Sequence, residues 1–188
     1  MEIRDAVRSD FEQITAIYKQ IVLTSTAIYN DEPVTVEDRL AWWKGRREQG
    51  YPVLVAAPPT PLAKSESVAE TRPILGFASF GDFRAWPGYR FTVEGTVHIH
   101  SSSRGQGVGS ALLKELVRRA RQMGKYTMVA GVDADNAASL RFLQRFGFGR
   151  VGHFRDVGFK FGRFLDLVFL QYWLSRPTQE KAHPNLHF

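Results

Sequence analysis

The residues with the clearest chemical potential lie in one stretch, residues 92–110, which reads TVEGTVHIHSSSRGQGVGS. Its first half alternates between apolar and polar residues, which predicts a strand with Glu94, Thr96 and His98 on one face. A carboxylate in the middle of a central strand is costly unless it faces a cleft, so Glu94 is a candidate general base. The alternative is a surface glutamate on a half-exposed strand. His98 is a candidate second base, although a histidine on a polar strand face is more often only solvated or hydrogen-bonded.

The second half of this stretch is a glycine-rich loop that leads into the amphipathic pattern of a helix. Glycine lets the backbone approach a phosphate closely, while the helix start and an arginine add positive charge. The pattern predicts a pyrophosphate-binding loop made of Arg104, Gly105, Gln106, Gly107, Val108, Gly109 and Ser110. A merely flexible turn is the alternative.

Two other glycine-rich phosphate sites do not fit this loop. A P-loop needs a lysine before the serine that opens the helix, whereas Ser110 directly follows Gly109. A dinucleotide-binding fold carries its glycines after the first strand, whereas these lie beyond the middle of the chain.

The elements that must position these residues follow from periodicity and turn signals. Ser9 is expected to cap a first helix with Glu12 at the capping-box spacing, and a second helix is expected from about Thr35 to near Gln49. Strands are expected at residues 2–7, 52–57, 74–82, 91–100, 126–132, 150–157 and 165–174, and further helices at residues 107–123 and 136–145. This order predicts an α/β (α+β) fold with a mixed, mostly antiparallel sheet of about seven strands flanked by about four helices.

The composition is that of an ordinary globular chain of 188 residues, with 44% hydrophobic and 23% charged residues. The absence of cysteine excludes disulfides, thiolate metal sites and a cysteine nucleophile. The net charge is +6, but the 25 basic residues are spread along the chain, which disfavours nucleic-acid binding. No run reaches the ~20 apolar residues of a membrane span and no signal peptide is visible, so a cytoplasmic location without membrane partners is expected.

One domain is expected to cover residues 1–174. Within it, residues 58–73 are rich in proline and small polar residues and are expected to form an exposed loop. Residues 175–188 show no pattern and are expected to be a disordered tail.

Three segments carry a family resemblance. Residues 104–109 (RGQGVG) match the Arg/Gln-x-x-Gly-x-Gly/Ala signature of the GNAT acetyltransferase superfamily, and residues 135–139 (DNAAS) and 145–148 (RFGF) resemble its downstream motif. Within the superfamily, the chain resembles the phosphinothricin and methionine sulfoximine/sulfone N-acetyltransferases over about residues 2–174. The stretches TST, YRFTVEGT and GFKFGRFLDL carry this closer resemblance, at residues 24–26, 89–96 and 158–167.

The resemblance implies the fold and the use of acetyl-CoA as co-substrate, with no metal. It implies that Glu94 is the general base of the Thr-Val-Glu motif. It also implies that the backbone groups of Val97, His98 and Ile99 pair with the pantetheine arm, one N–H polarising the thioester carbonyl. Asn136 would bond the same arm, assisted by Ser139, although Asn136 is also expected to cap its helix.

The resemblance also implies a pocket for a small amino-acid-like substrate, with residues Tyr29, Arg84, Trp86, Tyr89 and Glu94 around it. Where phosphinothricin enzymes carry a second arginine, this chain has Trp86. Tryptophan cannot hold a phosphinate as arginine does, so the Arg84–Trp86 pair favours an uncharged polar or sulfur-containing side chain such as methionine sulfone. The tyrosines could instead be buried with satisfied hydroxyls.

One position departs from the family. Leu143 stands where the superfamily has the tyrosine or histidine that protonates the leaving thiolate. This departure keeps a catalytically silent acetyl-CoA-binding module open as an alternative. Acetylation of a protein N-terminus or lysine is a second alternative, which would need an open groove that the loop at residues 58–73 could build or block. The segment at residues 158–167 resembles strands that build the family's dimer, so a homodimer is expected.

Overall fold

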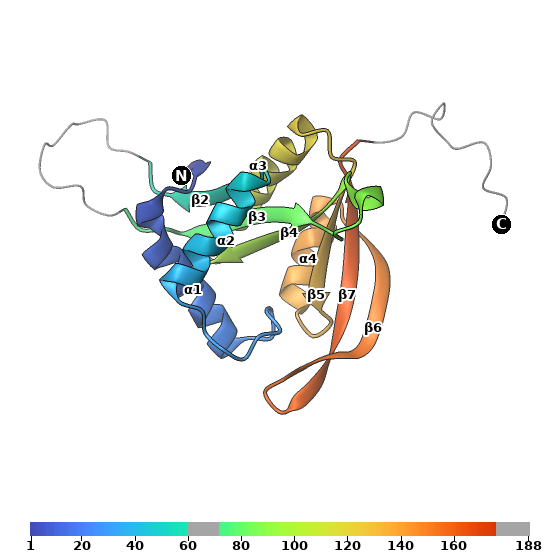
Figure 1. The fold of residues 1–188 in the computed structure, drawn as a ribbon. Helices are drawn as coiled ribbons and strands as arrows, with labels where there is room; N and C mark the ends of the chain where they lie inside the picture. Colours follow the sequence, from blue (N-terminus) through green and yellow to red (C-terminus); the bar gives the residue numbers. More distant parts are fainter. Residues whose placement is uncertain (60–71, 176–188) are drawn as a thin grey trace, which may run out of the picture.

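The protein is described by a computed structural model covering residues 1–59 and 72–175. One sheet of seven strands organises it, in the spatial order β1-β2-β3-β4-β5-β7-β6 (Figure 1). The strands are β1 Glu2–Asp5, β2 Val53–Ala57, β3 Gly76–Asp82, β4 Thr92–Ile99, β5 Thr127–Asp133, β6 Gly149–Lys160 and β7 Arg163–Trp173. Only β4 and β5 pair in parallel; the other neighbours are antiparallel. The expected mixed, mostly antiparallel sheet is confirmed, whereas most of the expected loop and tail fall outside the described residues.

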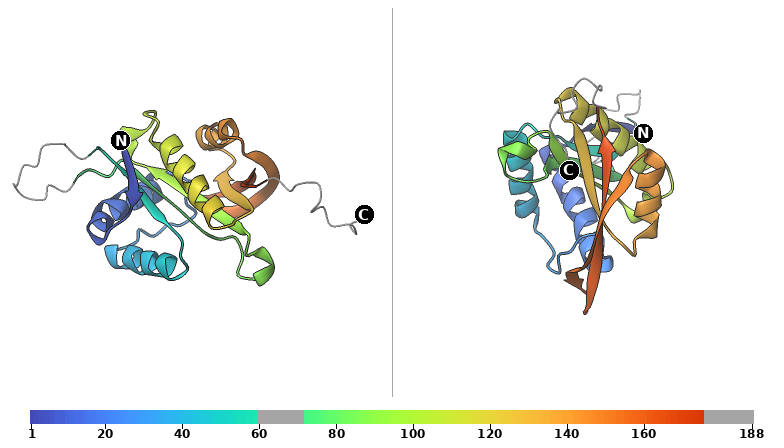
Figure 2. Two further views of the ribbon diagram at one scale, coloured as in Figure 1. Left: turned by 90° about the horizontal axis from the view of Figure 1, so that it is seen from above. Right: turned by 90° about the vertical axis from the view of Figure 1, so that its right-hand side faces the viewer.

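Two pairs of helices cover opposite faces of the sheet, as the view from above shows (Figure 2). α1 (Phe11–Thr24) and α2 (Val36–Glu48) lie on one face, and α3 (Val108–Gln122) and α4 (Ala137–Phe146) lie on the other. Three short 3-10 turns, Arg8–Asp10, Pro87–Tyr89 and Ser101–Ser103, complete the described elements. No helix among residues 1–59 and 72–175 is long and apolar enough to cross a membrane.

The alternation of β2 separates the two apolar cores. Leu54 and Ala56 point into the core under α3 and α4, whereas Val53, Val55 and Ala57 point into the core under α1 and α2. All five are buried because helices cover both faces of this strand, so its sequence is a continuous apolar run.

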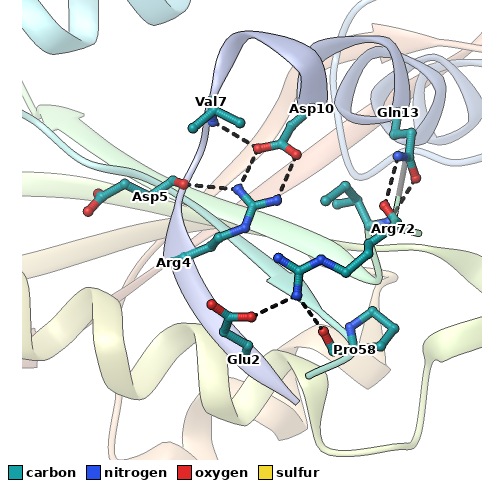
Figure 3. Close-up of polar contacts among 9 residues, drawn as sticks. Glu2, Arg4, Asp5, Val7, Asp10, Gln13, Pro58 and Arg72 are labelled. Carbon is teal, nitrogen blue, oxygen red and sulfur yellow. Dashed lines mark hydrogen bonds and ion pairs between the residues drawn. The ribbon is translucent and has the colours of Figure 1, made fainter. Parts of the chain in front are cut away.

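The start of α1 differs from the sequence expectation, and the predicted Ser9 cap is wrong. The chain enters α1 through a 3-10 turn in which the Asp10 carboxylate accepts from the Val7 N–H at 2.8 Å. The same carboxylate accepts two hydrogen bonds from Arg4 of β1, at 2.7 and 2.8 Å (Figure 3). The Asp10 carboxylate is thus engaged by Arg4 and by the Val7 N–H, and no side chain caps the start of α1. For α2, the expected start at about Thr35 is confirmed, and Thr35 caps the helix through a reciprocal capping box with Asp38.

The divergence of β4 and β5 is the feature that positions the candidate site. These strands pair only at Thr92–Glu94 with Thr127–Val129, and no further pairing between them follows. Against β3, by contrast, β4 keeps a continuous register from Val93 to Ile99. β4 and β5 therefore separate although the register between β3 and β4 contains no bulge. The strict alternation predicted for β4 holds.

The β6–β7 hairpin reaches past the end of β5 towards the segment that follows α1 (Figures 1 and 2). Lys160, at the tip of the hairpin, is 1% exposed, and its ammonium donates to the carbonyl oxygens of Val22, Ser25 and Ile28 at 2.7, 2.9 and 2.7 Å. A single buried cation thus joins the hairpin to the connection between α1 and α2.

Candidate active site

A cleft of about 110 Å³ lies where β4 and β5 separate. Residues 95–98 of β4 and residues 130–133 of β5 form its two walls. α4 contributes Ser139 and Leu143, and the residue before it contributes Asn136. Both strands here have backbone groups that no neighbouring strand pairs, since the ladder between them stops at Glu94. An extended ligand can therefore pair with the strand edges as an added strand would.

The glycine-rich loop lies at the start of α3, as predicted. Gly107 is the N-cap of α3 with a φ of +80°, and Gly105 has a φ of +77°. Both values lie in the left-handed region that side chains disfavour, so the two glycines allow a turn that aims successive N–H groups outward. No side chain caps this helix start, which leaves its N–H groups available to an anion. Arg104, Gln106 and Gly107 are exposed beside it, whereas Val108 is buried as the anchor of the helix.

The remaining cleft residues on α4 have mixed roles. The Asn136 side chain caps α4 by accepting from the Ser139 N–H at 3.1 Å, which confirms the predicted cap. Both residues also line the cleft, so capping and ligand binding are compatible. Leu143 is 7% exposed and lines the cleft as well, so the position where the family resemblance implied a proton donor carries an apolar side chain that faces the cleft. The Ile99 side chain packs against the core under α3.

Glu94 stands at the edge of the cleft on the face of β4 that looks towards α2. Its Oε1 lies 3.5 Å from the position that a Cβ on Gly131, a cleft residue, would occupy. Partial burial raises the pKa of the Glu94 carboxyl above its ordinary value, although the charges of Arg84 and Arg46 act in the opposite direction. A carboxylate with a raised pKa beside a cleft is suited to accept a proton.

His98 shares the face of Glu94 but not its chemistry. Its ring packs against Phe77 at 5.0 Å and lies edge-on to Tyr18 at 6.0 Å between ring centroids. Burial, and secondarily the charge of Arg39, lowers the pKa of His98 to about 4. The imidazole is therefore neutral and a weak base at neutral pH, so the interpretation of His98 as a packed residue outweighs that of a second base. Its backbone still lines the cleft.

The predicted substrate residues lie outside the set that lines the cleft. Arg84 is exposed, its guanidinium lies 4.3 Å from the Phe83 ring centroid, and its charge acts on Glu94. Trp86 is 76% exposed and Tyr89 is 43% exposed, the latter packing edge-on against Phe83. These side chains thus stand in the loop before β4, with Arg84 near enough to Glu94 to influence its ionisation.

Tyr29 lies at the opposite end, between the α1–α2 connection and the hairpin. Its hydroxyl donates to the carbonyl of Asp166 at 2.9 Å, and its ring covers Gly158, where any side chain would overlap it. Burial and nearby carboxylates raise the pKa of Tyr29 to about 12. This is the satisfied, packed tyrosine that the sequence left as the alternative; its proposed contact with substrate stays a prediction.

Sequence reasoning missed two arginines of α2. Arg39 and Arg46 are seven residues apart, with Trp42 between them, and both guanidinium groups are half-buried towards the sheet. Arg46 packs on Gly81, the cross-strand neighbour of Glu94. The signal was available in the spacing, because positions i, i+3 and i+7 share one helix face.

Asp133 was missed as well. It ends β5, is 3% exposed, lines the cleft and accepts from Thr26 and from the Asp135 N–H. Within residues 1–59 and 72–175 no group of three His, Asp or Glu side chains could hold a metal ion.

Comparison with known proteins adds independent observations. The model of the Acetyltransferase (GNAT) family matches residues 14–148. An L-methionine sulfoximine/L-methionine sulfone acetyltransferase of Salmonella typhimurium is 43% identical over 182 residues, covering 97% of this chain and 99% of that protein. A phosphinothricin N-acetyltransferase of Streptomyces coelicolor is 34% identical over 178 residues, covering 94% and 96%.

Structural similarity agrees with these matches. The structure of yncA from Salmonella typhimurium with its cofactor acetyl-CoA has a TM-score of 0.83 and 42% identity, covering 97% of this chain and 99% of that one. The family model spans the glycine-rich loop, the cleft strands and α4, so the match includes the parts that form the candidate site. The chain therefore belongs to the GNAT family of N-acetyltransferases.

Proposed function

We propose that this chain transfers an acetyl group from acetyl-CoA to the amino group of a small amino acid, with Glu94 as general base. The observation that carries the proposal is the Glu94 carboxylate, which stands beside cleft residue Gly131 with a raised pKa. A proton acceptor at the edge of a cleft with unpaired strand edges is the arrangement that amine acylation requires.

The described residues fit acetyl-CoA in two places. The exposed loop at Arg104–Gly107 and the uncapped start of α3 suit a pyrophosphate. The strand edges at residues 95–98 and 130–133, with Asn136 and Ser139, suit the amide-bearing pantetheine arm. When bound, acetyl-CoA supplies an acetyl group activated as a thioester.

The chain's own residues then have two tasks in the transfer. Glu94 accepts the proton of the incoming ammonium, which at neutral pH is mostly charged because free amines have a pKa of about 8–10. The cleft has no donor at Leu143 for the departing thiolate. A thiol with a pKa of ~8.5 leaves without one, so removal of the amine proton is the harder step.

The substrate class is supported by the relatives and by the loop before β4. A relative that spans 97% of the chain is named for methionine sulfoximine and methionine sulfone. Arg84 lies near Glu94, whereas Trp86 supplies no charge for a phosphinate. We therefore propose a methionine sulfone or sulfoximine type of acceptor ahead of phosphinothricin.

The test is the pH dependence of Glu94→Gln. In the wild type, kcat/KM should fall as the pH drops through the raised pKa of Glu94, because the protonated carboxyl cannot accept the amine proton. In Glu94→Gln this acidic limb should disappear and the rate should be lower by ~10²- to 10⁴-fold, with acetyl-CoA affinity retained. A variant within threefold of the wild type across the pH range would contradict the role of Glu94. Binding of acetyl-CoA without thiol release by any amine in the wild type would favour the silent module.

We also propose that the protein acts as a homodimer. The sheet-edge strand β6, its turn and the start of β7 expose apolar side chains at Val151, Phe154, Val157, Phe159, Phe161 and Phe164. A long apolar edge strand is a liability unless another chain covers it, and a second copy provides an identical, self-complementary edge. Light scattering should give a dimer that Phe164→Asp weakens, whereas Phe91→Asp, which changes an exposed phenylalanine outside the hairpin, should remain dimeric. A monomeric wild type at micromolar concentration would contradict this proposal.

A further inference from the structure

Gly81 of β3 is a strand glycine whose missing side chain leaves room for an arginine of α2. A Cβ at this position would overlap the guanidinium of Arg46, which lies against the strand where a side chain of residue 81 would stand. Arg46 is half-buried there, with its guanidinium carbon 5.8 Å from the Trp42 ring centroid. Glycine inside a strand often marks the close approach of another group. Gly81 therefore fixes where the Arg46 charge lies.

That charge lies beside Glu94. Gly81 and Glu94 are cross-strand partners in the antiparallel pair of β3 and β4. The Cβ positions of such partners lie about 4.5–5.5 Å apart on one face of the sheet, and the Arg46 guanidinium occupies one of the two. The Glu94 carboxylate extends the other way, with Oε1 3.5 Å from the Cβ position of Gly131 on β5. Arg46 is thus a close neighbour of Glu94 on the side away from the cleft.

Arg46 acts on Glu94 through space and not through a bond. Within residues 1–59 and 72–175 it forms no ion pair, and its Nη1 donates at 3.4 Å to Gln49 of its own helix end. A nearby cation favours the ionised carboxylate, whereas a hydrogen bond would occupy an oxygen that has to accept a proton. This arrangement keeps both carboxylate oxygens of Glu94 available to an amine.

Two cations oppose the effect of burial on Glu94. Burial raises the pKa of the Glu94 carboxyl, and the charges of Arg84 and Arg46 act against that rise. Arg84 is exposed on the loop before β4, where solvent and salt screen its charge. Arg46 is half-buried, so its charge is screened less. Of the two, Arg46 has the fixed position that a permanent effect on the base requires.

The other ionisable groups near Arg46 do not change charge near neutral pH. The Asp82 carboxylate accepts from the Tyr51 hydroxyl, to which Lys125 donates at 3.0 Å. Burial and the bond to Asp82 raise the pKa of Tyr51 to about 12, so its hydroxyl stays protonated. Burial lowers the pKa of His98 to about 4, so its ring stays neutral. A titration near neutral pH on this face therefore reports the general base.

We infer that Arg46, lying on Gly81, is a positioning residue whose fixed charge keeps Glu94 ionised, and so able to accept a proton, near neutral pH. The inference rests on the proposed function and adds the group that sets the pH range of its base. Without this charge Glu94 would hold its proton up to a higher pH. The base would then be lost on the acidic side of the profile and kept on the alkaline side.

The experiment is the dependence of kcat/KM on pH, measured with L-methionine sulfone. Arg46→Gln removes the charge, and Gly81→Ala keeps the arginine but displaces its guanidinium, the flexible end of that side chain. In both variants the acidic limb should move to higher pH by about one unit. The rate on that limb should be roughly tenfold lower, while the alkaline plateau stays within threefold of the wild type. Arg46→Lys, which keeps a charge, should retain most of the wild-type profile.

Two arginines of the same helix provide matched controls. Arg39 is also half-buried, between Tyr18 and Trp42, but its charge acts on His98, so Arg39→Gln should leave the acidic limb in place. Arg47 is exposed over the Trp43 ring, and Arg47→Gln should likewise leave the limb in place.

A carbon-13 NMR titration of the Glu94 carboxyl, assigned by its absence in Glu94→Gln, gives a readout independent of turnover. It should move upward by the same amount in Arg46→Gln and in Gly81→Ala. An unmoved carboxyl titration, or a loss of activity that is equal at every pH, would overturn the inference and leave Glu94 as the base. A carboxyl titration that moves while the acidic limb persists in Glu94→Gln would instead overturn the proposed role of Glu94 and keep its interaction with Arg46.

Discussion

Replacing Lys160 with methionine should loosen the wall of the active-site cleft from a distance. The Lys160 ammonium is buried and donates to the carbonyls of Val22, Ser25 and Ile28, which end α1 and begin the connection to α2. That connection supplies Ala27 to the cleft. Methionine fills a similar volume but donates no hydrogen bond, so three carbonyls lose their partner.

The size of the effect follows from those three contacts. Each hydrogen bond to a charged group contributes about 1.5–3 kcal/mol, and leaving a buried carbonyl unpaired adds to the loss. The desolvation of the ammonium, which methionine avoids, offsets several kcal/mol of that sum. We therefore expect a net destabilisation of about 2–4 kcal/mol, equivalent to a fall in Tm of about 5–15 °C for a chain of this length.

Thermal and urea unfolding of Lys160→Met, with kcat/KM below the melting range, would measure both consequences. The control is Lys44→Met, because Lys44 is 79% exposed and its one ion pair is 3.9 Å long, so its loss should change stability by less than about 0.5 kcal/mol. The kcat/KM of Lys160→Met should fall, because the connection that carries Ala27 of the cleft is less well ordered. A variant as stable and as active as the Lys44 control would refute the reasoning that this buried cation orders the α1–α2 connection.

Three further outcomes are expected. Gly107→Ala and Gly124→Ala each place a Cβ at a positive φ in open space, and each should lose about 1–2 kcal/mol of stability. Only Gly107→Ala should weaken the binding of acetyl-CoA in a titration. Equal affinities of the two variants would contradict the phosphate-loop assignment. Leu143→Tyr should change kcat less than tenfold, and a gain above a hundredfold would show that thiolate protonation limits the rate. Because the folded-state pKa of Glu94 is raised, its ionised carboxylate destabilises the fold, so the stability of Glu94→Gln relative to the wild type should increase as the pH rises from the ordinary carboxyl pKa through the raised one. A denaturation series showing the opposite trend would contradict the raised pKa.

Local patterns in the sequence determined most of the fold. The alternation of residues 92–100 predicted a strand with Glu94 and His98 on one face, and the structure keeps that alternation because the register with β3 has no shift. The start of α2 near Thr35 and the Asn136 cap of α4 were also predictable, because a capping side chain binds a backbone N–H only two or three residues further along the chain. The glycines at 105 and 107 predicted a turn that requires positive φ values, and the structure has such values at both positions.

Tertiary contacts decided what those patterns left open. The expected Ser9 cap is absent, because the chain enters α1 through a 3-10 turn whose Asp10 carboxylate binds Arg4 of β1. Burial beside Tyr18 and Phe77 lowers the pKa of His98 and so makes it a weak base. Lys160, which nothing in the sequence marks, is buried and joins the hairpin to the α1–α2 connection. Arg39 and Arg47 lie on the same helix and look alike in the sequence, yet the fold half-buries Arg39 between Tyr18 and Trp42 and leaves Arg47 exposed. Burial, counter-ions and their absence are properties of the folded assembly of elements, and they determine which charged side chains can act on a ligand.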